Sequence, residues 1–207
     1  MNSRIAIITD IHGNLEGLDA VRRDVEEIGC DRLICLGDLV DGGSFDNEVA
    51  RVIRDLGIPC VRGNHDENEA LDLDADVRDY LSSLPESIEE DGVLYTHISP
   101  RECRRKIVDA YEAWNVFDDC RARLIFVGHA HIPLIFGERS PHSASASEHA
   151  FVYHEPFALD PEDRYIVCVG AIGYPRDGVR YPRYAVFDRA TYTVEMRIVD
   201  GVVLPYG

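Results

Sequence analysis

The chain has 207 residues, of which 45% are apolar and 9% aromatic, and its formal net charge is −17. That length and apolar content suffice for one domain with a substantial core. The apolar runs fall far short of the roughly 20 residues of a membrane span, which excludes a transmembrane protein. The acidic surplus disfavours broad contact with nucleic acid, because such binding draws on lysine and arginine to neutralise phosphates.

The six cysteines include no C-x-x-C pair, and most lie in apolar contexts such as Leu33-Ile34-Cys35-Leu36. This pattern is typical of buried thiols in a reducing compartment. The N-terminus enters an apolar run with Arg4 as its only early cation, so no signal peptide is predicted. We therefore expect a cytoplasmic protein.

The first sixty residues alternate between strand and helix patterns. Each β-rich run is followed by apolar residues at helical spacing, and Gly29 and Gly57 close the helical stretches. Three such units in a row predict a parallel sheet flanked by helices. The predicted elements are strands at 4–9, 32–36 and 58–62 and helices at 15–28 and about 46–56.

The middle of the chain predicts a helix over 66–81, in which Asp66 and Glu69 resemble a capping box and Pro85 follows as a breaker. A hairpin around Asp91-Gly92 follows. The further predicted elements are hairpin strands at 88–90 and 93–96, a helix at about 104–120 and a strand at 124–127.

The last third is rich in residues that favour extended conformations. Strands are predicted at 151–157, 165–169, 184–188 and 191–199. Residues 138–150 are rich in Ser, Ala and His without periodicity, and we interpret them as a mobile surface loop that borders the active site. No linker divides the chain, so residues 1–207 are expected to form a single domain.

Five short polar clusters follow apolar runs in a fixed order. In open α/β sheets functional groups collect beyond the carboxyl ends of strands, where the first three clusters fall. Residues two apart in an extended segment point the same way, which would direct both side chains of D-x-H or H-x-H toward one ion. The clusters are Asp10-Ile11-His12, Gly37-Asp38, Gly63-Asn64-His65-Asp66, Thr96-His97 and Gly128-His129-Ala130-His131.

Each cluster alone also has a structural interpretation. Asp10 and His12 suit a strand-to-helix turn in which Asn14 caps the helix, and Asp38 suits a turn between glycines. His97 fits a metal ligand or a hydrogen-bonded core residue equally well. The set is harder to explain structurally, because five of the eight histidines lie in these clusters and the other three lie in or beside residues 138–150.

The third cluster carries the clearest chemistry. Gly63 permits close approach of the backbone, Asn64 offers a neutral oxygen ligand, and His65 is a candidate proton donor. Asp66 is placed either to orient His65 or to cap the next helix.

The ordered pattern D-x-H, G-D, G-N-H-D, H and G-H-x-H resembles the calcineurin-like metallophosphoesterase superfamily. The stretches Asp10-Ile11-His12-Gly13-Asn14-Leu15-Glu16 and 169–178 are similar to its small bacterial and archaeal phosphodiesterase branch. The resemblance implies an α/β fold, a four-layer β-sandwich (α/β/β/α) with the metal site at the C-terminal ends of the strands.

The resemblance also implies a site with two divalent metal ions. His65 would donate a proton to the leaving group with support from Asp66, and Asp41 would either lie behind the site or cap a turn. The first ion would be held by Asp10, His12 and His131 and the second by Asn64, His97 and His129, with Asp38 bridging the two.

The chain departs from the family pattern in three places. Ile98 follows His97 where the branch usually has glycine, and 168–171 reads C-V-G-A where N-P-G-S is common. Gly42 replaces the phosphate-binding arginine of the phosphoprotein phosphatase branch, which argues against a serine/threonine phosphatase. Arg176 is a candidate phosphate clamp on a tight turn, or a surface arginine paired with Asp177.

Oxygen and imidazole ligands without thiolate suit Mn²⁺, which we expect, with iron, Zn²⁺ or Ni²⁺ as alternatives. Two such ions would activate a shared water as a hydroxide for attack on a phosphoester. The predicted function is thus a metal-dependent phosphodiesterase or phosphatase whose partner is a small phosphorylated molecule. The alternatives are a protein-interaction module of the same fold with weak or no turnover, and a nuclease, which the charge disfavours.

Overall fold

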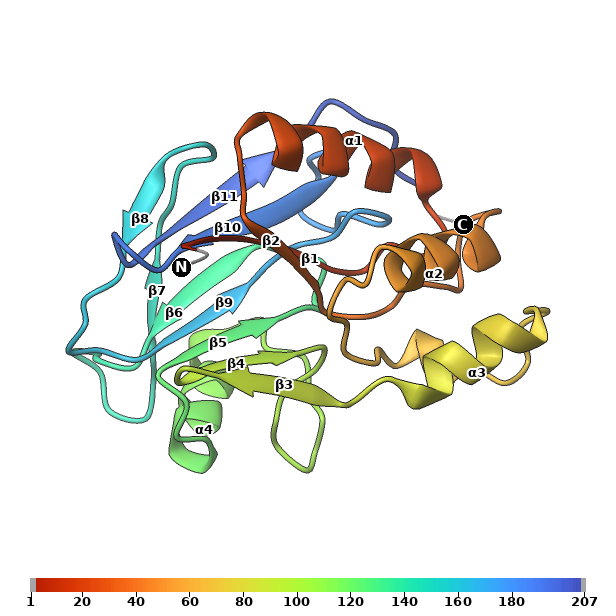
Figure 1. Cartoon of the computed structure of the whole chain (residues 1–207). Helices are drawn as coiled ribbons and strands as arrows, with labels where there is room; N and C mark the ends of the chain where they lie inside the picture. The colour runs from red at the N-terminus through yellow and green to blue at the C-terminus, as the bar shows by residue number, and fades with distance from the viewer. Residues whose placement is uncertain (1–2, 206–207) are drawn as a thin grey trace.

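The computed structural model describes residues 3–205, and it contains two β-sheets that face each other with helices on both outer sides (Figure 1). The first sheet has the strand order β2-β1-β10-β11-β8 and the second has the order β3-β4-β5-β9-β6-β7. The strands are β1 Arg4–Ile8, β2 Arg32–Cys35, β3 Ser87–Glu90, β4 Val93–Thr96, β5 Leu124–Val127, β6 Leu134–Gly137, β7 Ser147–His149, β8 Pro156–Ala158, β9 Tyr165–Cys168, β10 Arg183–Asp188 and β11 Thr193–Ile198. The helices are α1 Leu15–Glu27, α2 Asp46–Asp55, α3 Ala75–Ser83 and α4 Ala110–Asp119, with a short 3₁₀ helix η1 at His65–Glu67.

Alternating side chains of β1 show how the first sheet is covered on both faces. Ala6 and Ile8 pack in one cluster with residues of α1, α2 and α3, whereas Ile5 and Ile7 pack in a second cluster with strands of the other sheet. A strand buried on both faces must be apolar throughout, which explains the continuous run in β1.

The second sheet repeats this arrangement with one helix. Ile125 and Val127 of β5 pack against α4, and Leu124 and Phe126 point between the sheets. The predicted four layers, helices, sheet, sheet and helix, are therefore confirmed (Figure 1).

Both sheets are mixed, and their parallel pairs determine where the polar clusters meet. β1 pairs in parallel with β2, and β4, β5 and β9 are parallel neighbours. The remaining pairs are antiparallel. The parallel strands that precede polar clusters bring their C-terminal ends to one edge of each sheet.

Helix α1 begins at its cap as predicted. Asn14 Oδ1 accepts a hydrogen bond from the backbone N–H of Gly17 at 3.1 Å. Asn14 Nδ2 also donates to the carbonyls of Ile172 and Val202, at 3.1 and 2.8 Å. One side chain therefore ends the first loop and connects it to two late segments of the chain.

The strand predicted at 58–62 is wrong. That segment forms only an isolated bridge between Cys35 and Cys60, because Pro59 lacks a backbone N–H and only a short part of the segment runs beside β2. The helix predicted over 66–81 is also wrong in its first half, since η1 ends at Glu67 and α3 begins at Ala75.

Two other predictions need correction. The helix predicted at 104–120 begins only at Ala110, and β8 covers Pro156–Ala158 instead of 151–157. The segment 138–150 is not structureless throughout, because β7 pairs with β6 and Ala146 is buried under α4. Strand β6 was missed, although its Leu-Ile-Phe run is apolar.

Candidate metal centre

All five polar clusters meet where the parallel strands end. Asp10 follows β1, Asp38 follows β2, His97 follows β4, and His129 and His131 follow β5. The first two loops are tied together by backbone hydrogen bonds from 10–13 to 37–39, with N···O distances of 2.8 to 3.0 Å. The sheets therefore fix the relative positions of the chemical groups.

The first ligand group consists of Asp10, His12, Asp38 and His131, all buried. His131 Nε2 lies 3.0 Å from Asp10 Oδ1. His12 Nε2 lies 3.9 Å from Asp10 Oδ1 and 3.7 Å from Asp38 Oδ2. The potential ligand atoms of the group all lie within 4.8 Å of one another, which is close enough for them to surround one cation.

The second group consists of Asp38, His97 and His129 and shares Asp38 with the first. His97 Nε2 lies 3.1 Å from Asp38 Oδ2 and 3.1 Å from Asn64 Oδ1. The amide oxygen of Asn64 therefore faces the same space. The structure thus brings together all seven predicted metal ligands, with Asp38 between the two groups.

The remaining contacts of these side chains leave ligand atoms free toward the centre. Nδ1 of His12, His97 and His131 lies 3.0, 2.8 and 2.7 Å from a backbone carbonyl oxygen, which places a proton on Nδ1 and turns Nε2 toward the centre. Asp10 Oδ1, His12 Nε2 and Asp38 Oδ2 are buried without a hydrogen-bond partner. Buried acceptors facing one another need a cation, so the residues fit a metal site.

The electrostatics are those of a compact acidic and basic cluster. Burial opposes ionisation of Asp10, but His131 and the other imidazoles outweigh it and lower its pKa. Burial also disfavours protonation of His97, but the charge of Asp38 raises its pKa to about 9. Burial and then His97 lower the pKa of His129 to about 4, so His129 is neutral and ready to act as a ligand near neutral pH.

The carboxylates of Asp41 and Asp66, which lie near His65, have different partners from those expected. His65 Nδ1 lies 2.8 Å from Asp41 Oδ2, so Asp41 orients His65. Asp66 instead accepts backbone hydrogen bonds from Asp38, Leu39 and Gly63 at 2.8 to 2.9 Å. The expectation that Asp66 supports His65 or caps a following helix is therefore corrected: Asp66 holds two ligand loops together.

A family model described as a calcineurin-like phosphoesterase superfamily domain matches residues 3–191. The chain belongs to this superfamily. A relative from Methanocaldococcus jannaschii, an uncharacterised protein, is 33% identical over 229 aligned positions, which cover 97% of this chain and 88% of the relative.

Solved structures agree with the family. A metallophosphoesterase from Sphaerobacter thermophilus is 31% identical, with a TM-score of 0.85 over 97% of this chain and 89% of that one. The phosphoesterase YfcE from E. coli, at 14% identity, a TM-score of 0.54 and coverage of 95% and 100%, shares the fold. Within residues 3–205 of the present chain, no helix combines the length and apolarity that a bilayer crossing requires.

Steric contacts explain why Gly42 stands where the phosphoprotein phosphatase branch has an arginine. A Cβ at Gly42 would lie 2.5 Å from Cε2 and 2.7 Å from the hydroxyl oxygen of Tyr174. The Tyr174 ring also packs on His12, with 5.2 Å between ring centroids. An arginine at Gly42 would therefore require Tyr174 to move away from His12.

Two positively charged side chains, Arg176 and Lys106, lie at the edge of the candidate site. Arg176 is exposed and its backbone N–H donates to the backbone carbonyl of His131, whereas Asp177 pairs with the buried Arg183. Of the two alternatives for Arg176, the pairing with Asp177 is therefore not observed within residues 3–205. Partial burial and then Arg176 lower the pKa of Lys106. Lys106 was missed from the sequence because it lies in a charged stretch with no motif.

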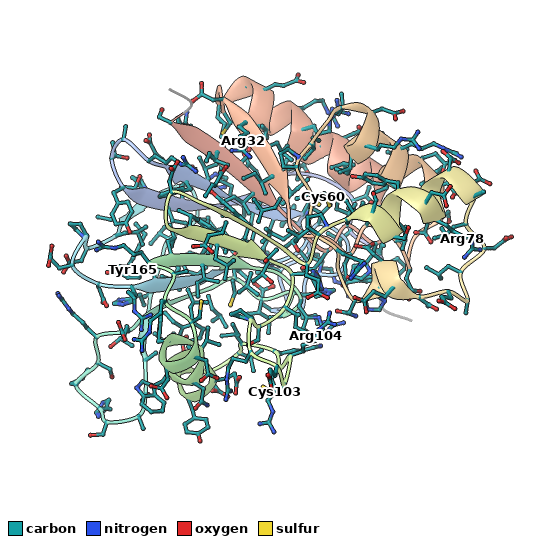
Figure 2. The ribbon with its side chains drawn as sticks, turned by 60° about the horizontal axis from the view of Figure 1, so that its bottom comes forward. Arg32, Cys60, Arg78, Cys103, Arg104 and Tyr165 are labelled. Carbon is teal, nitrogen blue, oxygen red and sulfur yellow. The ribbon has the colours of Figure 1, made fainter. Side chains whose placement is uncertain are left out.

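The loop that carries Lys106 runs past the third cluster. Figure 2 shows Cys103 and Arg104 on this loop between β4 and α4. Arg104 lies 3.6 Å from Glu67 of η1. Cys103, like the other five cysteines, is a free thiol.

Proposed function

We propose that this chain hydrolyses phosphodiesters or phosphomonoesters of small molecules with two divalent cations. The observation that carries the proposal is the position of Asp38, which belongs to both ligand groups and whose buried Oδ2, like Asp10 Oδ1 and His12 Nε2, has no hydrogen-bond partner. Asp10, His12 and His131 would hold one cation, and Asn64, His97 and His129 the other. Mn²⁺ is the proposed metal, and the set of oxygen and imidazole ligands without thiolate suits iron, Zn²⁺ or Ni²⁺ as alternatives.

When bound, two such cations neutralise phosphoryl oxygens and lower the pKa of a bound water toward neutrality. The chain itself supplies the position of the bridge. Asp38 Oδ2 faces His12 and His97, while Asp38 Oδ1 accepts the backbone N–H of His65 at 2.8 Å. One carboxylate therefore sets both the shared ligand atom and the location of His65.

His65 is the proposed general acid. Its ring meets that of His12 edge-on at 4.8 Å between centroids, and 37% of its side chain is exposed, so it borders the site and reaches solvent. With Nδ1 held by Asp41, Nε2 is left to donate a proton to the departing alkoxide oxygen. Such donors typically contribute about 10²–10⁴-fold to the rate.

Lys106 and Arg176 are proposed to attract the substrate. Their charges lie close enough for Arg176 to lower the pKa of Lys106 and for Lys106 to lower the pKa of His129. A phosphoester carries negative charge, and two cations at the edge of the site would raise its local concentration in a protein whose net charge is −17.

The test combines metal content with turnover. Purified protein loaded with Mn²⁺ should contain two ions per chain by elemental analysis, and a panel of phosphodiesters and phosphomonoesters should reveal hydrolysis that chelator abolishes. A protein that binds two ions but hydrolyses none of the panel would instead favour the interaction module. A protein that binds no metal would refute the proposed centre.

A further inference from the structure

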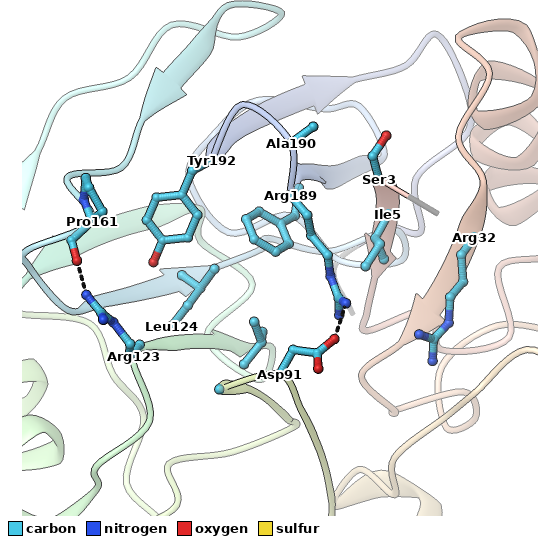
Figure 3. A pocket seen from close by; sticks show the side chains of 13 residues that line it. Ser3, Ile5, Arg32, Asp91, Arg123, Leu124, Pro161, Arg189, Ala190 and Tyr192 are labelled. Atoms are coloured by element: carbon cyan, nitrogen blue, oxygen red, sulfur yellow. Dashed lines mark hydrogen bonds and ion pairs between the residues drawn. The ribbon is translucent and has the colours of Figure 1, made fainter. Parts of the chain in front are cut away.

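A cleft lies at the opposite end of the sandwich from the candidate metal centre. A cleft of about 810 Å³ opens between the β3–β4 turn and the β10–β11 turn, beside the first residues of β1, β2 and β5 (Figure 3). The metal ligands follow the last residues of β1, β2 and β5. The cleft is therefore separated from the catalytic groups by the length of the strands, and its volume falls in the range of small-molecule sites.

The inner wall of the cleft is apolar. Ile5, Val93, Leu124 and Phe187 line it, and each of them belongs to the cluster packed between the two sheets. Tyr192 completes the wall, with its ring edge-on to Phe187 at 6.1 Å between centroids. The first four side chains are only 1–5% exposed, so an apolar or aromatic body in the cleft would leave water chiefly against the half-buried Tyr192.

The rim of the cleft is basic. Arg32 and Arg189 share the carboxylate of Glu90, and Arg189 also pairs with Asp91. Two arginines are thus balanced by two carboxylates.

Arg123 supplies the surplus charge. Within residues 3–205 it forms no ion pair, and its guanidinium donates only to the backbone carbonyl of Pro161. A guanidinium with free donors beside an apolar wall is suited to a carboxylate, sulfonate or phosphate group. The contrast with the acidic surface elsewhere makes this an anion-attracting spot.

Tyr192 is held in a costly backbone conformation. Its φ is +53°, in the left-handed region that glycine and asparagine adopt readily and bulky residues avoid. The strain places the ring in the cleft, with the hydroxyl on the side of Leu124 and Arg123 (Figure 3). Strained residues persist where neighbouring structure holds them, often at ligand-binding positions.

We propose that this cleft binds a small aromatic anion. The ring of the ligand lies against Phe187 and Tyr192, and its acidic group pairs with Arg123. Three observations support this: a cleft with an apolar wall, an arginine without a carboxylate partner, and an aromatic residue of that wall in a left-handed turn conformation. The site does not depend on phosphoester hydrolysis at the other end of the molecule.

The test uses two dyes that share one ring system. 8-Anilinonaphthalene-1-sulfonate carries a sulfonate, whereas N-phenyl-1-naphthylamine is neutral, and both report binding by fluorescence. The sulfonate dye should bind one site per chain more tightly than the neutral dye. Arg123→Gln should weaken the sulfonate dye by roughly tenfold, as expected for loss of one charge-assisted contact, and leave the neutral dye unchanged.

Two further variants complete the experiment. Tyr192→Gly should weaken both dyes and still fold, because glycine adopts the required φ without strain. Arg121→Gln is the matched control: this exposed arginine lies outside the cleft, so both affinities should stay as in the parent protein. Circular dichroism melting confirms that each variant is folded.

Three results would overturn the proposal. The first is equal affinity of the two dyes in the parent protein, or no binding of either. The second is an Arg123→Gln or Tyr192→Gly variant that binds the dyes unchanged. The third is loss of sulfonate dye binding on Asp38→Asn, which would locate the dye at the metal centre.

Discussion

Asp41→Asn tests whether the hydrogen bond to His65 serves proton donation. Asn keeps the size of the side chain and one oxygen acceptor but removes the negative charge. A hydrogen bond to a charged group is worth roughly 1.5–3 kcal/mol and a neutral one roughly 0.5–1.5 kcal/mol, a difference of about 1–1.5 kcal/mol. Both side chains are about a third exposed, at 33% and 37%, so solvent screening reduces the difference. We expect a loss of about 1 kcal/mol, or roughly fivefold in kcat/KM.

The assay compares p-nitrophenyl and phenyl esters of methyl phosphate. The phenolate of the phenyl ester is the poorer leaving group and needs the proton, so the losses should concentrate there. His65→Ala should lower kcat/KM on the phenyl ester by about 10²–10³-fold and on the p-nitrophenyl ester far less. Asp41→Asn should show the same preference on its smaller scale.

Controls separate proton donation from damage to the centre. Asp72→Asn removes one exposed carboxylate elsewhere and should leave both esters unaffected. Metal content must stay at the parent value in every variant. Equal losses of His65→Ala on the two esters would refute the role of His65 as the acid. If kcat/KM fell in Asp41→Asn but not in His65→Ala, the role of Asp41 in orienting His65 would be refuted.

The remaining predictions concern metal binding and stability. Asp38→Asn should lower both the number of bound ions and the rate, since one side chain serves both groups; two ions at the parent rate, by elemental analysis and ester hydrolysis, would contradict this. Removal of metal by EDTA should lower the melting temperature and readdition of Mn²⁺ should restore it, because ligand that binds only the folded state stabilises it; calorimetry that detects no shift would count against the centre. Burial opposes ionisation of Asp24, but hydrogen bonds from Arg197 and Tyr184 lower its pKa below 3.8. The ionised carboxylate therefore stabilises the fold above about pH 4, and this stabilisation is lost as the pH falls through the lowered pKa. Asp24→Asn should therefore cost roughly 1–3 kcal/mol in urea unfolding at pH 7 and less at pH 3; a cost independent of pH would contradict the assignment.

The sequence predicted best those elements whose pattern is set by their own residues. The strand at 124–127 is observed with the predicted bounds, and the hairpin around Asp91-Gly92 is observed as β3 and β4. Continuous apolar runs and a two-residue turn specify these elements locally. The seven side chains predicted as metal ligands also lie together, and six of them follow the end of a strand, whereas Asn64 follows only the isolated bridge at Cys60.

The errors arise where tertiary contacts override local patterns. Asp66 resembles a helix cap, but its carboxylate is used by three backbone N–H groups of the ligand loops, and the chain that follows η1 is not helical until α3. The strand at 156–158 forms because β11 offers it an edge. Neither partner is adjacent in sequence, so no local pattern could reveal it.

The D-x-H and H-x-H pairs do not reach the centre through the expected extended backbone, and His129 and His131 lie in different ligand groups instead of facing one ion. The residues concerned have left-handed φ values between +52° and +73°, which send their side chains toward one centre over sharp turns. They are Asp10, His12, Asp38, Asp41, His129 and His131.

Left-handed residues cost free energy, on the order of 1–3 kcal/mol each, unless surrounding structure holds them. The backbone hydrogen bonds between 10–13 and 37–39 supply that support for the first loops. Aspartate and histidine are also among the residues that tolerate this conformation best. Glycine would relax the turns but supply no ligand, so residues that bind metal and accept a positive φ are the ones that this site requires. Six of the eleven non-glycine residues with positive φ within residues 3–205 lie at these chemical positions, so we expect the turns to serve the centre more than the stability of the fold.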